Sequence, residues 1–550
     1  MNKYILALTA LTVGLTACSD EWDDHYQVAE RTEGTLWENI SAQSDLTHFA
    51  KVLDATGFSR TLSSSQVFTV FAPTDDAFSL QECDSLIASY NEQVSQGVKD
   101  DYNTVLQEFV ENHIALYNYS VNSTTRDSII MMNGKYQVLD QNGLSGSNYS
   151  LTNQLCNNGV LFKLQKQATF LPNIYQYIKT APGLDSVAAF YKAYEYFVFS
   201  ANASVPGEIV NGKTQYLDSV TYLTNMLLAM ARFATEDSSY MALLPTNEVW
   251  KTELEKMQQY YQYDNTVVGR DSLMYLYPRL QILESAYFSN TMNPESKAKT
   301  RLVSNLGQMW ALGSNYSLYS YPDGGFYWRW NMGKDEFFAG TEAVQCSNGT
   351  VYRKSGTWSE HLLDLVVKHD TINQEAESTY TNDSVFTSST RPISRVYVTK
   401  DNPHYNDITG SGYIEIAPLA SALPKAMFNI YNVRSNVKYE FAVVTVPPTA
   451  GDTLATPLCN NFRVILKWND ADGKQMSQRY PSGSGYFESD SLHVQAIVVD
   501  TITFPTSSFG LEKPQVKVEI DGYTNPKLVR AGTHSSTTRI DKFVLTPILE

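Results

Sequence analysis

The chain has 550 residues, of which 43% are hydrophobic and 18% are charged. At about one domain per 150 residues, this supplies material for roughly three or four packed domains and excludes global disorder and fibrous repeats. Lys and Arg total 41 against 58 Asp and Glu, so the net charge of −17 disfavours nucleic acid as a partner. The 36 Tyr residues suit a surface that recognises ligands, since each ring adds contact area and a hydroxyl.

Residues 1–17 predict a signal peptide. An apolar run over 4–13 is too short to span a bilayer, and it leads into Leu15-Thr16-Ala17-Cys18. That segment resembles the lipobox of bacterial lipoproteins, in which cleavage before the cysteine exposes a thiol for acylation. The resemblance implies a lipid anchor at Cys18 in place of a transmembrane span, and an ordinary cleavage site is the alternative.

Residues 18–35 predict a flexible acidic tether, because Ser19-Asp20-Glu21-Trp22-Asp23-Asp24 cannot bury enough apolar surface to fold alone. Acidic residues directly after a lipidated cysteine resemble the surface-export signals of lipoproteins in Bacteroidetes-type bacteria. The resemblance implies an outer-membrane protein that faces the cell exterior. A solvated linker without that role is the alternative.

An Asp followed by Ser or Thr and then an apolar residue recurs more often than average composition gives. This triplet resembles the O-glycosylation acceptor of the same bacterial group, and glycans would suit an exported protein. The local alternative is that Asp and Ser cap helices and open turns, so exposed copies in loops are the better candidates. The acceptor hydroxyls would be those of Ser85, Ser128, Ser186, Ser219, Ser272, Thr371, Ser384, Thr453, Ser491 and Thr501.

Residues 36–57 place apolar side chains at helical spacing and predict two short amphipathic helices. Residues 67–71 then predict a buried strand. The turn at 72–76 feeds a further helix, which Thr74 or Asp75 can cap.

Three motifs in order resemble the fasciclin domain family. Phe68-Thr69-Val70-Phe71-Ala72-Pro73-Thr74-Asp75-Asp76-Ala77-Phe78 stands at its most recognisable motif, Asn112-His113-Ile114 fits its central Tyr-His region with Asn in place of the usual aromatic, and Asn158-Gly159-Val160-Leu161-Phe162 fits its closing segment. The resemblance covers 36–172 and implies an α/β-wedge fold and a role in adhesion. We expect His113 to be packed and hydrogen-bonded rather than catalytic, because no partner motif accompanies it.

A weaker second fasciclin-like copy is predicted over 173–377. Residues 241–250 repeat the strand, the Pro-Thr turn and the helix, and residues 346–352 repeat the closing turn and strand. The segment Tyr277-Pro278-Arg279-Leu280 falls where the histidine should be. Any role of that histidine is therefore in doubt for this copy.

A Ser- and Thr-rich linker is predicted at 378–394, followed by a β-sandwich over 395–550. The sandwich looks like the jelly-roll or galactose-binding type of surface glycan-binding modules, by analogy of architecture alone. The fold class is therefore α+β multidomain, with two fasciclin-like domains before a sandwich. The strand-like segments are 395–398, 412–416, 439–444, 462–468, 494–499, 516–520 and 543–545.

Four cysteines follow Cys18, and they allow three pairings among which the sequence does not choose. No CxxC motif or Cys–His ligand spacing appears, so buried free thiols are expected and structural zinc is disfavoured. Residues 469–473 contain Asp and Asn at the spacing of a calcium-binding loop but lack the remaining ligands of a full site. A polar hairpin turn is therefore expected. The four cysteines are Cys83, Cys156, Cys346 and Cys459.

No HExxH, GxSxG, Walker or GxGxxG motif appears, so we expect no enzyme, no cofactor and no bound metal. One aromatic cluster follows a Gly-rich turn, and its Tyr327, Trp328 and Trp330 could stack on sugar rings. The alternation within the cluster also fits one face of a strand against a core.

Three functional classes remain. We favour a non-enzymatic surface lipoprotein that binds protein or glycan through the fasciclin pair and the sandwich. The second class is an accessory, ligand-capturing subunit of a TonB-dependent nutrient importer of the SusC/SusD type. The third is a hydrolase with an unrecognised pair of acids. Membrane contact is expected through the lipid anchor.

Overall fold

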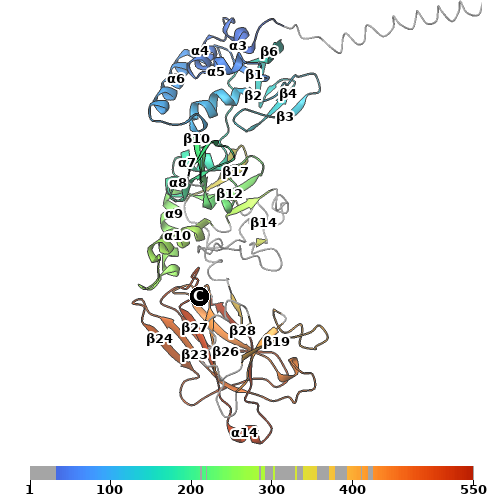
Figure 1. Cartoon of the computed structure of the whole chain (residues 1–550), viewed down its shortest axis with the longest axis vertical. Helices are drawn as coiled ribbons and strands as arrows, with labels where there is room; N and C mark the ends of the chain where they lie inside the picture. The colour runs from blue at the N-terminus through green and yellow to red at the C-terminus, as the bar shows by residue number, and fades with distance from the viewer. Residues whose placement is uncertain are drawn as a thin grey trace, which may run out of the picture. The chain divides into compact units, whose positions relative to one another are not determined.

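The computed structural model describes residues 32–210, 213–218, 220–283, 286–290, 302–303, 329–330, 338–355, 371–377, 393–410, 412–418 and 425–548. The chain folds into two compact units (Figure 1). The first comprises residues 1–173 with the short pieces 235–237 and 345–348, and the second comprises 174–234, 238–344 and 349–550. None of the helices in these segments is long and apolar enough to cross a bilayer.

Short helices of the first unit pack against a sheet. The alternating side chains of one central strand separate two cores: Phe68 and Val70 face the helices, whereas Phe71 faces the opposite core. The helices are α3 (Leu36–Ser41), α4 (Thr47–Ala55), α5 (Phe58–Leu62) and α6 (Leu80–Ser95), followed by the short turns η1 (Asp100–Tyr102), η2 (Leu106–Val110) and η3 (Glu111–His113).

The helix after the predicted turn begins later than expected. Ser79 caps α6 in a capping box with Glu82, so the prediction that Thr74 or Asp75 caps it was wrong. Asp75 instead serves another helix, because its carboxylate accepts the backbone N–H groups of Thr47 at 3.2 Å and His48 at 2.9 Å at the start of α4.

The sheet of the first unit has seven strands in the order β2-β1-β7-β6-β5-β4-β3. β1 runs parallel to β7, with Phe68 opposite Gly159. Gly159 has φ +153° and a Cβ there would lie 1.9 Å from the carbonyl oxygen of Phe68, so only glycine fits. The strands are β1 (Phe68–Pro73), β2 (Ile114–Ala115), β3 (Arg126–Ile130), β4 (Tyr136–Asp140), β5 (Gly143–Leu144), β6 (Ser147–Cys156) and β7 (Gly159–Leu164).

The middle of the chain repeats this pairing. Parallel strands β12 and β17 place Tyr240 opposite Gly349, and a Cβ on Gly349, whose φ is +150°, would lie 2.0 Å from the Tyr240 carbonyl oxygen. The sheet order is β13-β12-β17-β16. The elements are α7 (Ile174–Thr180), α8 (Asp185–Lys192), η4 (Met226–Ala229), β12 (Tyr240–Pro245), α9 (Asn247–Gln258), η5 (Gln259–Tyr261), α10 (Arg270–Leu283), β13 (Tyr287–Ser289), β16 (Glu342–Cys346) and β17 (Gly349–Lys354).

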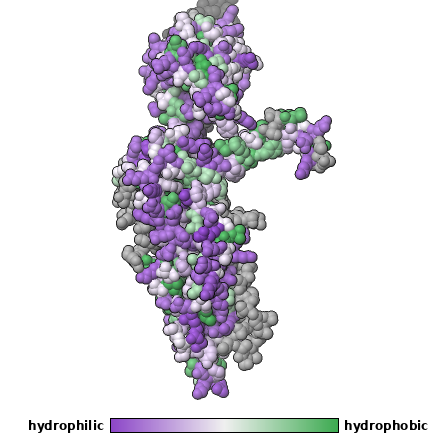
Figure 2. Space-filling view, turned by 90° about the vertical axis from the view of Figure 1, so that its left-hand side faces the viewer, coloured by the Kyte–Doolittle hydropathy of each residue, from purple (hydrophilic) through white to green (hydrophobic). Residues whose placement is uncertain are grey.

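A two-stranded arm leaves this region, and we call residues 195–225 the apolar arm. β8 (Glu195–Phe199) pairs with β11 (Thr221–Asn225), and β9 (Val205–Val210) pairs with β10 (Lys213–Asp218). Figure 2 shows hydrophobic side chains gathered on it. Phe197, for example, is 65% exposed. A separate short pair joins β14 (Leu302–Val303) to β15 (Arg329–Trp330).

The C-terminal region is a β-sandwich of two antiparallel sheets. Phe428 of one sheet packs on Phe543 of the other with ring centroids 4.9 Å apart. One sheet has the order β19-β20-β28-β22-β26 with β18 beside β28, and the other has β21-β27-β23-β24 with β25 beside β23. The strands are β18 (Ile372–Glu375), β19 (Ile393–Tyr397), β20 (Gly412–Ile416), β21 (Lys425–Ile430), β22 (Lys438–Thr445), β23 (Asn461–Asn469), β24 (Gln475–Tyr480), β25 (Phe487–Glu488), β26 (Gln495–Thr503), β27 (Val516–Gly522) and β28 (Thr538–Pro547), with η7 (Pro448–Ala450) and α14 (Pro526–Arg530) between them.

Two features of this region differ from the sequence-based expectation. β18 belongs to the sandwich although it precedes the predicted linker at 378–394, so the sandwich begins before residue 395. The sandwich also shares a core with the middle region, because Tyr261 and Tyr277 pack on Phe509 with ring centroids 5.4 Å and 4.9 Å from it. The second unit therefore holds both regions together.

The predicted polar hairpin turn at 469–473 is confirmed. It joins β23 to β24, and the Asp470 carboxylate accepts the backbone N–H groups of Asp472 and Lys474. That carboxylate therefore closes a turn.

Candidate functional site

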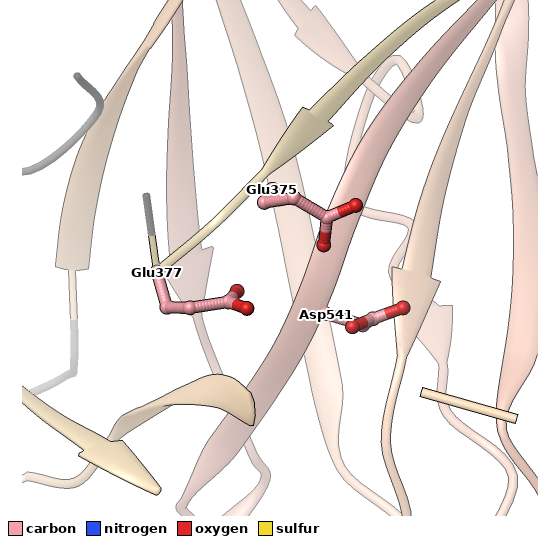
Figure 3. A group of neighbouring side chains, drawn as sticks. All are labelled: Glu375, Glu377 and Asp541. Atoms are coloured by element: carbon pink, nitrogen blue, oxygen red, sulfur yellow. The ribbon is translucent and has the colours of Figure 1, made fainter. Parts of the chain in front are cut away.

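Three carboxylates meet where β18 and β28 lie side by side in the sandwich (Figure 3). Glu375 ends β18, Glu377 follows two residues later in the turn after it, and Asp541 stands on β28. The backbone N–H of Ala376, between the two glutamates, donates to the carbonyl oxygen of Asp541 at 2.8 Å, which holds the two segments in register. The result is the carboxylate cluster, in which ligand oxygens of Glu375, Glu377 and Asp541 lie within 4.8 Å of one another.

This cluster is enclosed by protein. Glu377 is 1% exposed and Asp541 is fully buried. The hydroxyl of Thr409 lies 2.8 Å from a Glu375 oxygen and 3.2 Å from Oδ2 of Asp541, while Oδ1 of Asp541 has no hydrogen-bond partner among the described residues. The backbone also comes close, since a Cβ on Gly410 would lie 2.5 Å from Oε1 of Glu377.

Burial makes negative charge costly in the cluster. Desolvation, with repulsion from Glu375 and Asp541, raises the pKa of Glu377 to about 8. Desolvation, with repulsion from Glu375, raises the pKa of Asp541 to about 7. Three acids so placed must either keep protons or share a cation.

The donor set decides which cation would fit. The cluster offers carboxylate oxygens, with a hydroxyl beside them, and no nitrogen or sulfur ligand belongs to the group that the described residues form. Hard oxygen ligands favour Ca²⁺ or Mg²⁺ over zinc and copper, and Ca²⁺ tolerates the irregular geometry of a site made from loops and strand edges. The cluster is thus a candidate Ca²⁺ centre.

Sequence reasoning missed this group because it searched for His and Cys spacings and for one contiguous calcium loop. The acids come from the first and last strands of the sandwich, which only the folded sheet brings together. The available signal was Glu375-Ala376-Glu377, where two acidic residues stand two positions apart, but no strand was predicted there. The expectation that no metal binds stays a prediction.

His113 behaves as the sequence predicts. It is 1% exposed, and its Nδ1 lies 2.7 Å from the carbonyl oxygen of Phe109 while its Nε2 lies 3.0 Å from the backbone nitrogen of Ala168. Nδ1–H therefore donates and Nε2 accepts, which fixes a neutral ring. Burial lowers the pKa of His113 to about 4. The ring has no free nitrogen for proton transfer.

Several predicted site residues lie outside the described residues: Cys18, Tyr327, Trp328, Ser219 and Ser384. Trp330 ends the short strand β15, and its side chain is not among the described ones.

The remaining glycosylation candidates are spread over separate elements and form no common site in the described segments. Thr453 matches the expectation for an acceptor best, because it is exposed outside any helix or strand. Its Asp452 also accepts the N–H of Leu454 at 2.9 Å, so the local turn role is present as well. Ser85, Ser186 and Ser272 lie on helices, Ser128 and Thr501 lie on strands, and Thr371 and Ser491 lie in connections.

The four cysteines after Cys18 are free thiols in the structure. Cys83, Cys156 and Cys346 are buried, as expected, whereas Cys459 is partly exposed. Burial raises the pKa of Cys346 to about 12, so this thiol stays protonated at neutral pH.

A second feature of the sandwich is the solvent side of its five-stranded sheet. Tyr486 and Tyr523 stack there with ring centroids 4.7 Å apart and an interplanar angle of 9°. The Arg463 guanidinium lies 4.1 Å from the centroid of Tyr486 and 5.7 Å from that of Tyr523. All three side chains are half-buried, and Nε of Arg463 also donates to the carbonyl oxygen of Gly485 at 3.2 Å. We call these three residues the Arg463 platform.

The fasciclin domain family model matches residues 44–169. The first unit therefore contains a fasciclin domain. This match confirms the resemblance found in the three motifs of residues 36–172. No curated protein matches the sequence.

Solved structures resemble parts of the chain. A fasciclin domain pair from the insect cell adhesion molecule Fasciclin I is 10% identical and covers 59% of this chain and 99% of that chain, with a TM-score of 0.19. A xylan-binding domain from Paenibacillus barcinonensis is 8% identical and covers 33% of this chain and 97% of that one, with a TM-score of 0.21. A two-module xylanase fragment from Clostridium thermocellum is 10% identical with a TM-score of 0.21, and the match covers 32% of this chain and 28% of the xylanase fragment.

Proposed function

We propose that this chain is a non-enzymatic, lipid-anchored protein of the cell surface that binds glycan or protein ligands. The fasciclin domain at 44–169 supports a role in adhesion or interaction. Acylation of Cys18 would hold the protein at the outer membrane, and the acidic tether would carry the folded units outward.

The observation that carries this proposal is the Arg463 platform. Stacked tyrosines present a flat apolar surface, and a guanidinium held against them supplies directed hydrogen-bond donors. Sugar rings pair an apolar face with a rim of hydroxyls, so one such surface can meet both. Arg463 lies on β23, and the two tyrosines directly flank strands that pair with β23, which keeps the platform in place before any ligand arrives.

The shared strand register supports a divergent second fasciclin-like copy in the middle region. Both copies pair a strand that ends in proline with a strand that begins in glycine, in the same parallel register. The copies would present two related surfaces for interaction.

Binding of the intact protein to a glycan array tests the proposal, with Tyr523→Ala as the variant. We expect at least a tenfold loss of affinity for the glycans that the unaltered protein binds. Stacking of a ligand ring on an aromatic side chain contributes about 1–3 kcal/mol, and the variant removes that stacking. Tyr275→Ala is the matched control, since Tyr275 also stacks with an arginine, Arg279, at 3.8 Å. An equal loss in the control, or an array without bound glycans, would refute glycan binding at the platform.

The anchor is tested separately in cells. Metabolic labelling with a palmitate analogue should mark the mature protein and should leave Cys18→Ser unmarked. Protease added to intact cells should degrade the labelled protein. Survival of the protein under that treatment would place it on the inner side of the outer membrane.

A second candidate function is the importer subunit, and the observation that favours it is the apolar arm. Consecutive side chains of a strand point to opposite sides, yet Tyr196, Phe197, Val198 and Phe199 are each more than 40% exposed. A surface apolar on both sides is costly in water and suits burial in a larger assembly. Purification from outer membranes should then bring a barrel protein with the unaltered chain and less of it with Phe197→Ser. Purification without any barrel would exclude this role.

A further inference from the structure

The solvent side of β21, β23, β24 and β27 is positively charged, although the whole chain carries −17. Side chains directly opposite one another in neighbouring antiparallel strands share a side, so the strand register defines this surface. Five cations stand on it against two carboxylates. We call it the basic face, and its charged residues are Lys425, Arg463, Lys467, Arg479, Lys517, Glu519 and Asp521.

The two carboxylates neutralise only part of this charge. Glu519 lies 2.7 Å from Lys467 and 3.3 Å from Lys425, and Asp521 lies 3.7 Å from Lys425. Lys517 and Arg479 form no ion pair among the described residues. Glu488 on the flanking strand β25 lies 3.0 Å from His534, so its carboxylate is directed to that residue.

Two of the cations stand directly against each other. Lys467 and Lys517 are opposite residues of β23 and β27, an arrangement that repels like charges. A bound anion would relieve that repulsion, and Arg463, four residues before Lys467 on β23, could meet a second anionic group of the same ligand. The face therefore favours a ligand with negative charge.

Acceptor oxygens that lie among the cations of the basic face would bind hydrogen-bond donors rather than anions. Oδ1 of Asn429 is buried and has no hydrogen-bond partner among the described residues, whereas Oδ1 of Asp521 lies 3.7 Å from Nζ of Lys425. Asn429 is opposite Lys517, and Asp521 is opposite both Lys425 and Arg463, so both acceptors lie among the cations. Buried acceptors need donors, and hydroxyl groups supply them.

We infer that the basic face binds an acidic oligosaccharide, one that carries carboxylate or sulfate groups on hydroxylated rings. This ligand class meets all three demands at once: its anions meet the unneutralised cations, its hydroxyls supply a donor for Oδ1 of Asn429, and its rings stack on the Arg463 platform. An acidic peptide offers the charge but neither the hydroxyls nor the rings. The inference rests on the proposed glycan-binding function and names its ligand class.

The test uses the intact protein and an array of paired glycans. Each acidic member stands beside its neutral counterpart: oligogalacturonate beside its methyl ester, and sulfated oligosaccharides beside their desulfated forms. We expect the acidic partner of a pair to bind at least tenfold more tightly. The affinity should fall steeply when NaCl rises from about 50 mM to about 500 mM, because charge pairs on a surface are screened.

Lys517→Gln and Arg463→Gln should each weaken the acidic glycan about tenfold and leave the thermal unfolding midpoint unchanged. Arg279→Gln is the control, because Arg279 also stacks on a tyrosine but lies outside the basic face. Loss of affinity in that control would overturn the assignment of the face.

The outcomes separate the two proposals. If neutral glycans bind as tightly as their acidic counterparts, the glycan-binding function stands and the ligand class is wrong. If no glycan of either kind binds, both proposals fail. If an acidic peptide such as poly-glutamate binds as tightly as the best acidic glycan, charge alone explains the face and the inference is wrong.

Discussion

The fasciclin domain and the sandwich both bury titratable side chains, but the two regions differ in how many hydrogen-bond partners these side chains have. In the fasciclin domain His113 has a partner for each ring nitrogen, and the rings of Phe49 and Phe109 pack on it with centroids 5.7 Å and 4.7 Å away. In the sandwich three carboxylates face one another, and one oxygen of the buried Asp541 has no hydrogen-bond partner in the part of the chain that the structure describes. The histidine has all its hydrogen-bond partners, whereas the carboxylate cluster would gain stability from a cation.

This difference separates a structural buried group from a binding site. Burial is the largest cause of the pKa shift at both sites, since it lowers the pKa of His113 and raises the pKa of Glu377. Only the hydrogen-bond inventory tells them apart, because a polar group whose bonds are all made has nothing left to offer a ligand. A perturbed pKa is therefore a weaker indicator of function than an unsatisfied atom.

A first expected effect is an acid-dependent loss of stability in the fasciclin domain. The pKa of His113 is about 4 in the folded state and 6.5 in its unperturbed state. The stabilisation is thus present above pH 6.5 and is lost as the pH falls through 4, which amounts to about 3 kcal/mol. Hydrogen exchange of peptides around residues 106–114, measured from pH 7 to pH 4 and corrected for intrinsic rates, should report it.

His113→Gln keeps a polar group without the ionisation and is the matched variant. It lowers stability at every pH, but the slope between pH 6.5 and pH 4 should disappear. A slope equal to that of the unaltered protein would show that another group titrates.

The sandwich should respond to pH with the opposite sign. The folded cluster keeps protons that the unfolded chain releases, because the pKa values of Glu377 and Asp541 are raised to about 8 and about 7. Without a divalent cation, stability is therefore full below pH 4 and is lost as the pH rises toward 8. Hydrogen exchange of peptides from β18 and β28 in a chelator should become faster over that range.

Calcium should reverse this loss. At 100 times its dissociation constant a ligand stabilises the folded state by about 2.7 kcal/mol, and the gain should be larger at pH 8 than at pH 5. Asp541→Asn removes one charged ligand at nearly the same volume and should abolish the response. A calcium response that persists in this variant would mean that the ion binds elsewhere.

Features formed by residues close together in the sequence were predictable, whereas features that the fold assembles from distant residues were not. The fasciclin motifs mark strand β1, the histidine and the Asn158-Gly159 turn, because each is a local pattern with its own spacing. All seven predicted strand segments of the sandwich are present, because their alternation is local too. Four strands were missed: β18, β21, β24 and β25. In β18 and β24 the polar residues do not alternate with buried ones.

The candidate sites escaped prediction for the same reason. Glu375 and Asp541 come from opposite ends of the sandwich sequence, and their proximity follows only from the pairing of β18 with β28. Arg463 meets Tyr486 and Tyr523 from three separate segments. Even the helix cap was misplaced, because the carboxylate of Asp75 turns to a helix that lies earlier in the chain.

The smallest expected effect is the contribution of the Thr409 hydroxyl to the calcium affinity of the carboxylate cluster. Thr409→Val removes the hydroxyl that lies 2.8 Å from Glu375 and 3.2 Å from Asp541 while keeping the shape of the side chain. One hydrogen bond to a charged partner contributes about 1–2 kcal/mol, so the calcium affinity should fall roughly five- to thirtyfold. Titration calorimetry of the intact protein at pH 8 measures that change. An unaltered affinity would mean that the carboxylates hold their positions without Thr409, and the contrast with His113, which depends on every one of its partners, would then be sharper still.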